Sequence, residues 1–148
     1  MSIFYKLFIF SFLIMTISCS KNIVVKDVDY GWALEKVIKV SKDTKKVKRP
    51  DLFKFDPIYF FQAEDVLLGS NNSLRIIRDR EGFYFVTSNM FKNVYVLAWA
   101  EGGLELINKI DLGVENLEKP FFNQKGDYII LVNKNREFKL NRLGVLSD

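Results

Sequence analysis

Short apolar runs separated by turn-forming residues dominate the chain from residue 70 onward. The runs are rich in β-branched and aromatic side chains, and clusters of Asp, Asn, Glu and Gly separate them. They occupy residues 73–79, 83–89, 93–100, 104–112, 127–132 and 137–143. This pattern is typical of antiparallel strands joined by tight turns, and Gly102-Gly103 predicts one tight hairpin because glycine tolerates the positive φ that such turns require. We therefore expect a mainly β fold built as an antiparallel meander.

The polarity of individual runs predicts which strands are central. In residues 104–112 apolar positions alternate with charged ones, which predicts a strand with one wet face. The apolar positions of that run are Leu104, Leu106, Ile110 and Leu112. By contrast, residues 83–86, 94–99 and 128–132 are apolar on both faces. Such strands need cover on two sides, so either a second sheet packs across the first or the sheet closes.

A weak internal repeat accompanies this pattern. Gly82–Asn89 recurs as Gly126–Asn133, 44 residues later. That spacing matches one four-stranded blade, and residues 82–144 resemble β-propeller sequence. The resemblance implies blade-like meanders, although about 129 residues after the leader make only about three blades and a propeller needs at least four. A partial propeller-like arrangement and a two-sheet sandwich both stay open.

Residues 32–65 are less regular. Apolar positions such as Trp32, Leu34 and Val37 predict a short helix over residues 32–42, which ends before Pro50. The aromatic cluster that follows is interpreted as the core of a strand bent at Pro57, with an exposed platform for a partner protein as the alternative. Its members are Phe53, Phe55, Tyr59, Phe60 and Phe61. In such a strand the adjacent Glu64 and Asp65 would point to opposite faces, so they would not form an acid–base pair.

The N-terminal residues have the organisation of a secretion signal. Lys6 precedes an uncharged apolar run from Leu7 to Ile17, and small residues follow at once. The run is shorter than the roughly 20 apolar residues of a membrane-spanning helix, which makes an uncleaved anchor the second interpretation. We therefore predict a signal peptide with a signal helix over 1–18, a tether over 19–31 and a single mostly β domain over 32–148.

The end of this leader resembles the lipobox of bacterial lipoproteins, in the relaxed form found in spirochaetes. The matching residues are Thr16-Ile17-Ser18-Cys19, although the family prefers an aliphatic residue at Thr16 and a smaller one at Ile17. The resemblance implies that Cys19 is acylated, by palmitate for example, and becomes the first mature residue. Cys19 is the only cysteine, so it cannot form an intramolecular disulfide. Ordinary cleavage after Ser20 is the alternative.

Composition and charge limit the kinds of catalytic and binding site that the chain can form. The chain has no histidine and no second cysteine, which excludes Ser-His-Asp, Cys-His and histidine-ligated zinc chemistry. No catalytic residue, metal site or cofactor is predicted. Basic residues concentrate between positions 36 and 54, where they could contact an anionic surface or simply form a solvated loop. The candidates are Lys36, Lys39, Lys42, Lys45, Lys46, Lys48 and Arg49.

These observations lead to an expected function. We expect a lipid-anchored lipoprotein of the bacterial cell envelope, at the outer membrane on its periplasmic or surface side, that acts as a non-enzymatic binding or scaffold module. Its partners would be the membrane, through the N-terminal lipid, and a protein, but not nucleic acid. The propeller likeness implies an accessory to outer-membrane protein assembly. A surface adhesin that contacts a host and a carboxylate-based envelope glycoside hydrolase are the alternatives.

Overall fold

The computed structural model describes residues 34–40, 56–69, 72–101 and 103–147. Strands account for 55% of these residues and helix for 6%, which confirms the mainly β fold. The predicted signal peptide over 1–18 and the predicted tether over 19–31, with Cys19, lie outside the described residues. The described strands pair only with antiparallel neighbours, as the turn-rich sequence predicts.

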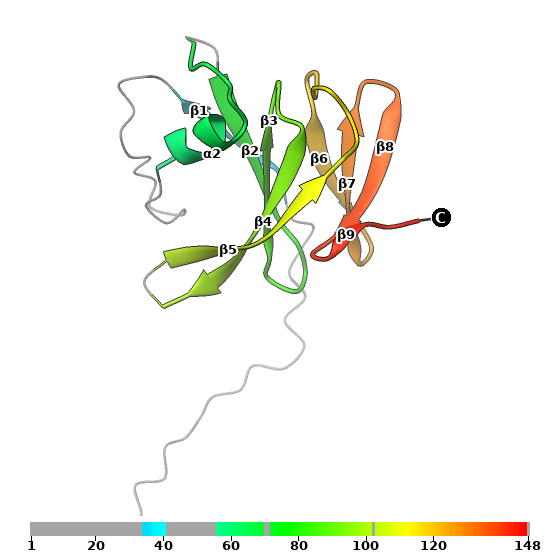
Figure 1. Ribbon diagram of the computed structural model, residues 1–148. Helices are drawn as coiled ribbons and strands as arrows, with labels where there is room; N and C mark the ends of the chain where they lie inside the picture. Colours follow the sequence, from blue (N-terminus) through cyan, green and yellow to red (C-terminus); the bar gives the residue numbers. More distant parts are fainter. Residues whose placement is uncertain (1–33, 41–55, 70–71, 102, 148) are drawn as a thin grey trace, which may run out of the picture.

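Two meandering sheets and one short helix make up the fold (Figure 1). The first sheet has the order β1-β2-β3-β4-β5 and the second has the order β6-β7-β8-β9. The strands of the first sheet are β1 (Lys36–Val40), β2 (Asn72–Arg78), β3 (Tyr84–Ser88), β4 (Asn93–Ala100) and β5 (Gly103–Asp111). Those of the second are β6 (Phe121–Lys125), β7 (Tyr128–Asn133), β8 (Arg136–Asn141) and β9 (Gly144–Val145). The helix α2 (Ile58–Ala63) joins β1 to β2.

The first sheet is the middle layer of the molecule. Its register places Ile77, Phe85 and Val96 on one face, which packs on the second sheet, and all three are buried. Val86 and Tyr95 point to the other face, where α2 packs. This arrangement confirms the expected cover on both sides for β3 and for residues 94–96 of β4, whereas Trp99 near the end of β4 is 69% exposed. Two packed antiparallel sheets, one of the two architectures that the sequence left open, describe the fold.

The second sheet packs on the first through its more apolar inner face. Its inner face carries buried side chains from β6, β7 and β8: Phe122, Ile129, Leu131, Phe138 and Leu140. On the outer face Asn123, Lys125, Glu137 and Lys139 are exposed, and among the described residues of this face only Ile130 of β7 is a buried apolar side chain. The second cover expected for residues 128–132 is therefore not found in the part of the chain that the structure describes. Because its outer face is largely polar and exposed, the second sheet is the outermost layer of the described fold. The described residues form neither a closed barrel nor a propeller.

The internal repeat maps onto equivalent strands of the two sheets. Residues 82–89 contain β3 and residues 126–133 contain β7, each the strand after a turn that contains a glycine. Both glycines adopt the left-handed region, with φ of 99° at Gly82 and 67° at Gly126. The final asparagines also correspond, because Asn89 accepts a hydrogen bond from the Lys119 amide and Asn133 accepts one from Glu118. The sequence repeat therefore corresponds to a turn and strand that occur once in each sheet.

The helix predicted over residues 32–42 is wrong where the chain is described. Residues 36–40 form β1, which pairs with β2 from Lys36 opposite Ile76 to Val40 opposite Asn72. Ile38 and Val40 are buried while Lys39 between them is exposed, so the apolar period is two. Branched side chains at these positions also favour a strand.

The bent strand predicted at Pro57 is wrong as well. Pro57 precedes the first turn of α2, and Asp56 Oδ1 accepts a hydrogen bond from the Ile58 amide 2.9 Å away. Proline is tolerated at this end of a helix because its missing N–H has no partner there anyway. The helix buries Phe61, while Tyr59 is exposed. The aromatic cluster is thus divided, and Phe53 and Phe55 lie outside the described residues.

β5 contains a β-bulge, so its apolar side chains do not all lie on one face as the sequence predicts. The pairing runs from Val96 opposite Asn108 directly to Leu97 opposite Leu106, which leaves Ile107 as an extra residue. The bulge shifts the alternation by one position. Leu106 therefore lies on the α2 side, whereas Ile110 lies on the side of the second sheet. The sequence also missed β6 and the two-residue β9.

Matched substitutions in β1 test the corrected assignment. Ile38 is 3% exposed and its neighbour Val37 is 44% exposed. We expect Ile38→Ala to lower the free energy of unfolding by about 2–4 kcal/mol, because it leaves a core cavity. Val37→Ala should cost less than about 1 kcal/mol. Chemical denaturation of both variants checks this, and equal losses would contradict a strand with one buried face.

Candidate functional site

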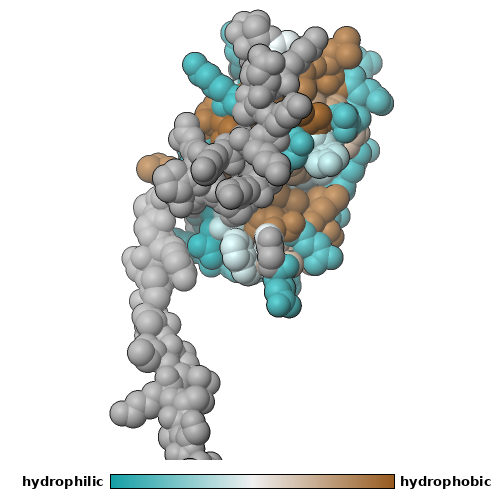
Figure 2. All heavy atoms as spheres, turned by 90° about the vertical axis from the view of Figure 1, so that its left-hand side faces the viewer, coloured by the Kyte–Doolittle hydropathy of each residue, from teal (hydrophilic) through white to brown (hydrophobic). Residues whose placement is uncertain are grey.

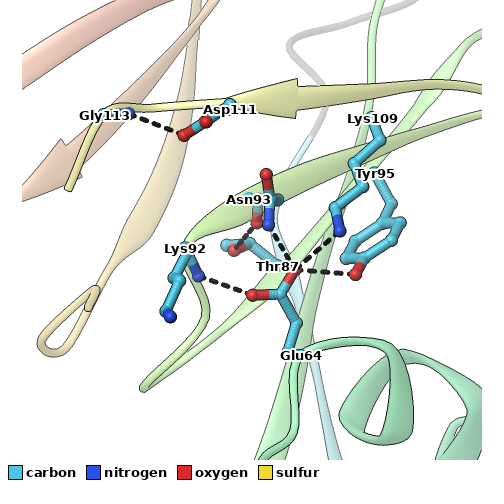
Figure 3. A network of polar contacts seen from close by, with 8 residues as sticks. All are labelled: Glu64, Thr87, Lys92, Asn93, Tyr95, Lys109, Asp111 and Gly113. Carbon is cyan, nitrogen blue, oxygen red and sulfur yellow. Dashed lines mark hydrogen bonds and ion pairs between the residues drawn. The ribbon is translucent and has the colours of Figure 1, made fainter. Parts of the chain in front are cut away.

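The carboxylate of Glu64 is the centre of a buried polar network (Figure 3). Its Oε1 accepts hydrogen bonds from Asn93 Nδ2 at 2.7 Å and from the Tyr95 hydroxyl at 2.6 Å. Its Oε2 accepts one from the Lys92 amide at 2.7 Å, and Lys109 Nζ lies 4.0 Å from Oε1. The side chain is only 1% exposed. Three donors and a nearby ammonium offset the cost of burying this charge.

Local structure explains how these residues converge. Glu64 directly follows the last turn of α2, and the backbone reverses there because Asp65 adopts a φ of 54°. The Val66 amide closes this reversal by donating to the Phe61 carbonyl. Asn93 and Tyr95 are two residues apart on β4, so both point to the α2 face of the sheet. The network therefore fastens the helix to the outer face of the first sheet.

Aromatic rings enclose the Tyr95 side of the network. The Tyr95 ring makes edge contacts with Phe60 at 5.2 Å and Phe91 at 6.2 Å between centroids. Lys109 Nζ lies 5.6 Å from the Tyr95 ring centroid. Burial raises the pKa of Tyr95 above its ordinary value of 10.0, and the hydrogen bond to Glu64 and the negative charge of that carboxylate raise it further.

A polar hollow of about 740 Å³ opens on one side of Glu64. Asp65 and Lys92 bring opposite charges to it, and Leu67 and Met90 bring exposed apolar surface. Amide and hydroxyl groups complete the lining, from Asn72, Ser88, Asn89 and Asn116. Glu64 and Asp65 both line this hollow, but only Asp65 is exposed. Glu64 is therefore a buried residue that holds α2, whereas Asp65 is a charge on the surface.

An apolar groove of about 430 Å³ lies on the other side, between α2 and the β4–β5 hairpin. Figure 2 looks onto this side of the molecule and shows apolar residues gathered between polar ones. Tyr59 is 69% exposed and Leu106 is 51% exposed. The lining residues are Asp56, Tyr59, Phe60, Ala63, Tyr95, Leu97, Leu104 and Leu106. Tyr95 belongs both to the groove and to the Glu64 network, so the two share one wall.

The structure places few of the residues that the sequence nominated. Lys36 and Lys39 are exposed on β1, but they are three positions apart and point to opposite faces of the sheet. These two are the only candidates that the structure describes, so the basic contact surface stays a prediction. The other five candidates lie outside the described residues, namely Lys42, Lys45, Lys46, Lys48 and Arg49. Cys19 also lies outside them.

The described residues contain neither a cluster of metal-ligating side chains nor a membrane-spanning helix. Within residues 34–40, 56–69, 72–101 and 103–147, no group of three or more Cys, Asp or Glu side chains is placed to hold a metal ion. The same part of the chain contains no helix with the length and hydrophobicity needed to cross a bilayer.

Sequence reasoning missed the Glu64 network because its donors are 28 to 31 residues away along the chain. One signal could have found it. Asn93 and Tyr95 occupy the same face of an otherwise apolar strand, and buried polar side chains require partners. An acidic residue on a neighbouring element is the partner that satisfies both of these donors.

Comparison with known proteins gives no family assignment. The chain matches no protein-family profile, and no curated protein or solved structure is significantly similar to it.

Substitution of Glu64 tests the network. Glu64→Gln removes the charge and replaces one accepting oxygen with a donating amide, so at least one donor loses its acceptor. We expect the free energy of unfolding to fall by about 1–3 kcal/mol. The matched change Asp65→Asn, at an exposed neighbour, should change it by less than about 0.5 kcal/mol. Denaturant titrations of both variants check this, and equal effects would contradict an anchoring role.

Titration of Tyr95 gives a second test. Because folding raises this pKa, the stability contributed by the phenol is complete below pH 10.0 and is lost as the pH rises further. We expect wild type to lose stability between about pH 10 and pH 11 more steeply than Tyr95→Phe. Unfolding free energies of both proteins across this range provide the measurement. Parallel curves would show that Tyr95 ionises like an exposed tyrosine.

Proposed function

We propose that this protein is a lipid-anchored module of the bacterial cell envelope that binds a partner protein and performs no chemistry on it. The observation that carries the proposal is the apolar groove between α2 and the β4–β5 hairpin, whose rim residues Tyr59 and Leu106 are exposed. Exposed apolar surface around a depression is typical of protein contact sites. The leader ending at Cys19 supplies the anchoring half of the proposal.

The environment of Glu64 favours binding over catalysis. A carboxylate-based hydrolase needs one carboxylate as acid and a second as base or nucleophile. Glu64 is buried, and its two oxygens already accept three hydrogen bonds from the protein. These contacts give Glu64 a structural role in holding α2. We therefore place glycoside hydrolysis behind protein binding, and we keep accessory action in outer-membrane protein assembly as one form that the binding could take.

Two labels in intact cells test the proposal together. We expect a palmitate analogue to label wild type and Ser20→Ala but not Cys19→Ala, because only the Cys19 thiol can be acylated. A photoreactive residue at position 106 should give a discrete crosslinked band. The same residue at position 137, exposed on the outer face of the second sheet, serves as the control.

Each half of the proposal has its own contradictory result. A mature chain that begins at a residue other than 19 and carries no fatty acid would disprove the anchor. Identical crosslinking at positions 106 and 137 would disprove the groove as the contact site.

A further inference from the structure

The outer edge of β5 is divided into two unlike halves. β5 is the last strand of the first sheet, so one side of its backbone pairs with β4 and the other side pairs with no described strand. The Ile107 bulge bends the strand where the two halves meet, and in the second half Asn108 Nδ2 donates to the Arg142 carbonyl at 2.9 Å. Lys109 adds a charge. Bulges, covering contacts and lysines are the devices that keep an edge from pairing with another strand.

Apart from the bulge at its end, the first half of β5, residues 103–107, has none of these devices. Residues 103–107 contain no proline and no lysine. Within the described part of the chain, they make no hydrogen bond or ion pair beyond their ladder with β4. Five residues span about 17 Å, which is long enough for a short strand to pair with them. The backbone of this half is therefore an open template for strand addition.

The two faces of this half have different chemistry. Leu104 and Leu106 point toward the groove, opposite Trp99 and Leu97 of β4. Glu105 points to the other face, and Glu101 lies in the hairpin turn. Both glutamates are exposed, and in the described residues neither forms an ion pair. A strand added here would meet apolar side chains on one face and negative charge on the other.

We propose that residues 103–107 bind an extended peptide segment of a partner protein by strand addition, and that this segment alternates apolar and basic side chains. Its backbone would continue the first sheet beyond β5. Its apolar side chains would extend over Leu104 and Leu106 into the groove, and its basic side chains would pair with Glu105. Main-chain hydrogen bonds supply affinity in such complexes, while the side-chain pockets supply specificity. The inference rests on the proposed binding function and specifies its partner class.

The test uses the mature full-length chain in detergent micelles, with hydrogen exchange read by mass spectrometry. The probe is a short end-capped peptide of alternating valine and lysine, and its counterpart alternates valine and glutamate. We expect the lysine peptide to slow exchange at residues 103–107. Glu105→Lys should weaken its binding about three- to tenfold, because an opposite-charge cross-strand pair becomes a like-charge pair. Glu137→Lys, an equal charge change on the other sheet, should leave binding unchanged.

The remaining outcomes each overturn the proposal. No protection at 103–107 would exclude strand addition, and equal binding of the two peptides would exclude the basic specificity. Protection that appears without peptide and grows with protein concentration would identify a second copy of this chain as the occupant. Protection that requires added anionic vesicles would identify a lipid surface. Lipid on Cys19 is measured separately by intact mass, so loss of the anchor and loss of peptide binding are distinguishable.

Discussion

The position of α2 depends on one buried carboxylate. A helix of six residues has little stability of its own, because too few of its backbone groups are paired internally to offset the cost of nucleation. Phe61 contributes apolar burial, and Glu64 contributes hydrogen bonds to β4 and to the loop before it. Without this attachment the outer face of the first sheet would lose its cover. The groove and the hollow would also each lose a wall, since both are bounded by residues of this segment.

The sequence predicted those parts of the fold that depend on local pattern. β3 and β7 follow glycine turns and are short uninterrupted apolar runs, so the sequence predicts both the two strands and their repeat. β1 was mistaken for a helix because five residues are too few to distinguish the two periods, and its pairing with β2 decided the matter. The segment after Pro57 is aromatic-rich and so favours a strand by propensity. Its burial against Phe91 and Tyr95 favours the helix.

The candidate site was less predictable because it depends on register. A bulge at Ile107 cannot be inferred from alternation alone, yet it decides that Leu104 and Leu106 face the groove while Ile110 faces the second sheet. The Glu64 network likewise joins residues that are distant along the chain, and only the fold brings them together. The aromatic cluster was interpreted either as core or as an exposed platform. Phe61 is a core residue, whereas Tyr59 is exposed.

The two repeat-related asparagines have a consequence for how the molecule loses its structure. Asn89 directly follows β3 of the first sheet and Asn133 ends β7 of the second, and they accept hydrogen bonds from the adjacent amides of Lys119 and Glu118 in the connecting segment. If either sheet unfolded, this connection would lose one of these two asparagine contacts, and the other sheet would lose its apolar cover. The sheets are therefore coupled, and the domain should denature in a single cooperative step, with no stable half-folded species.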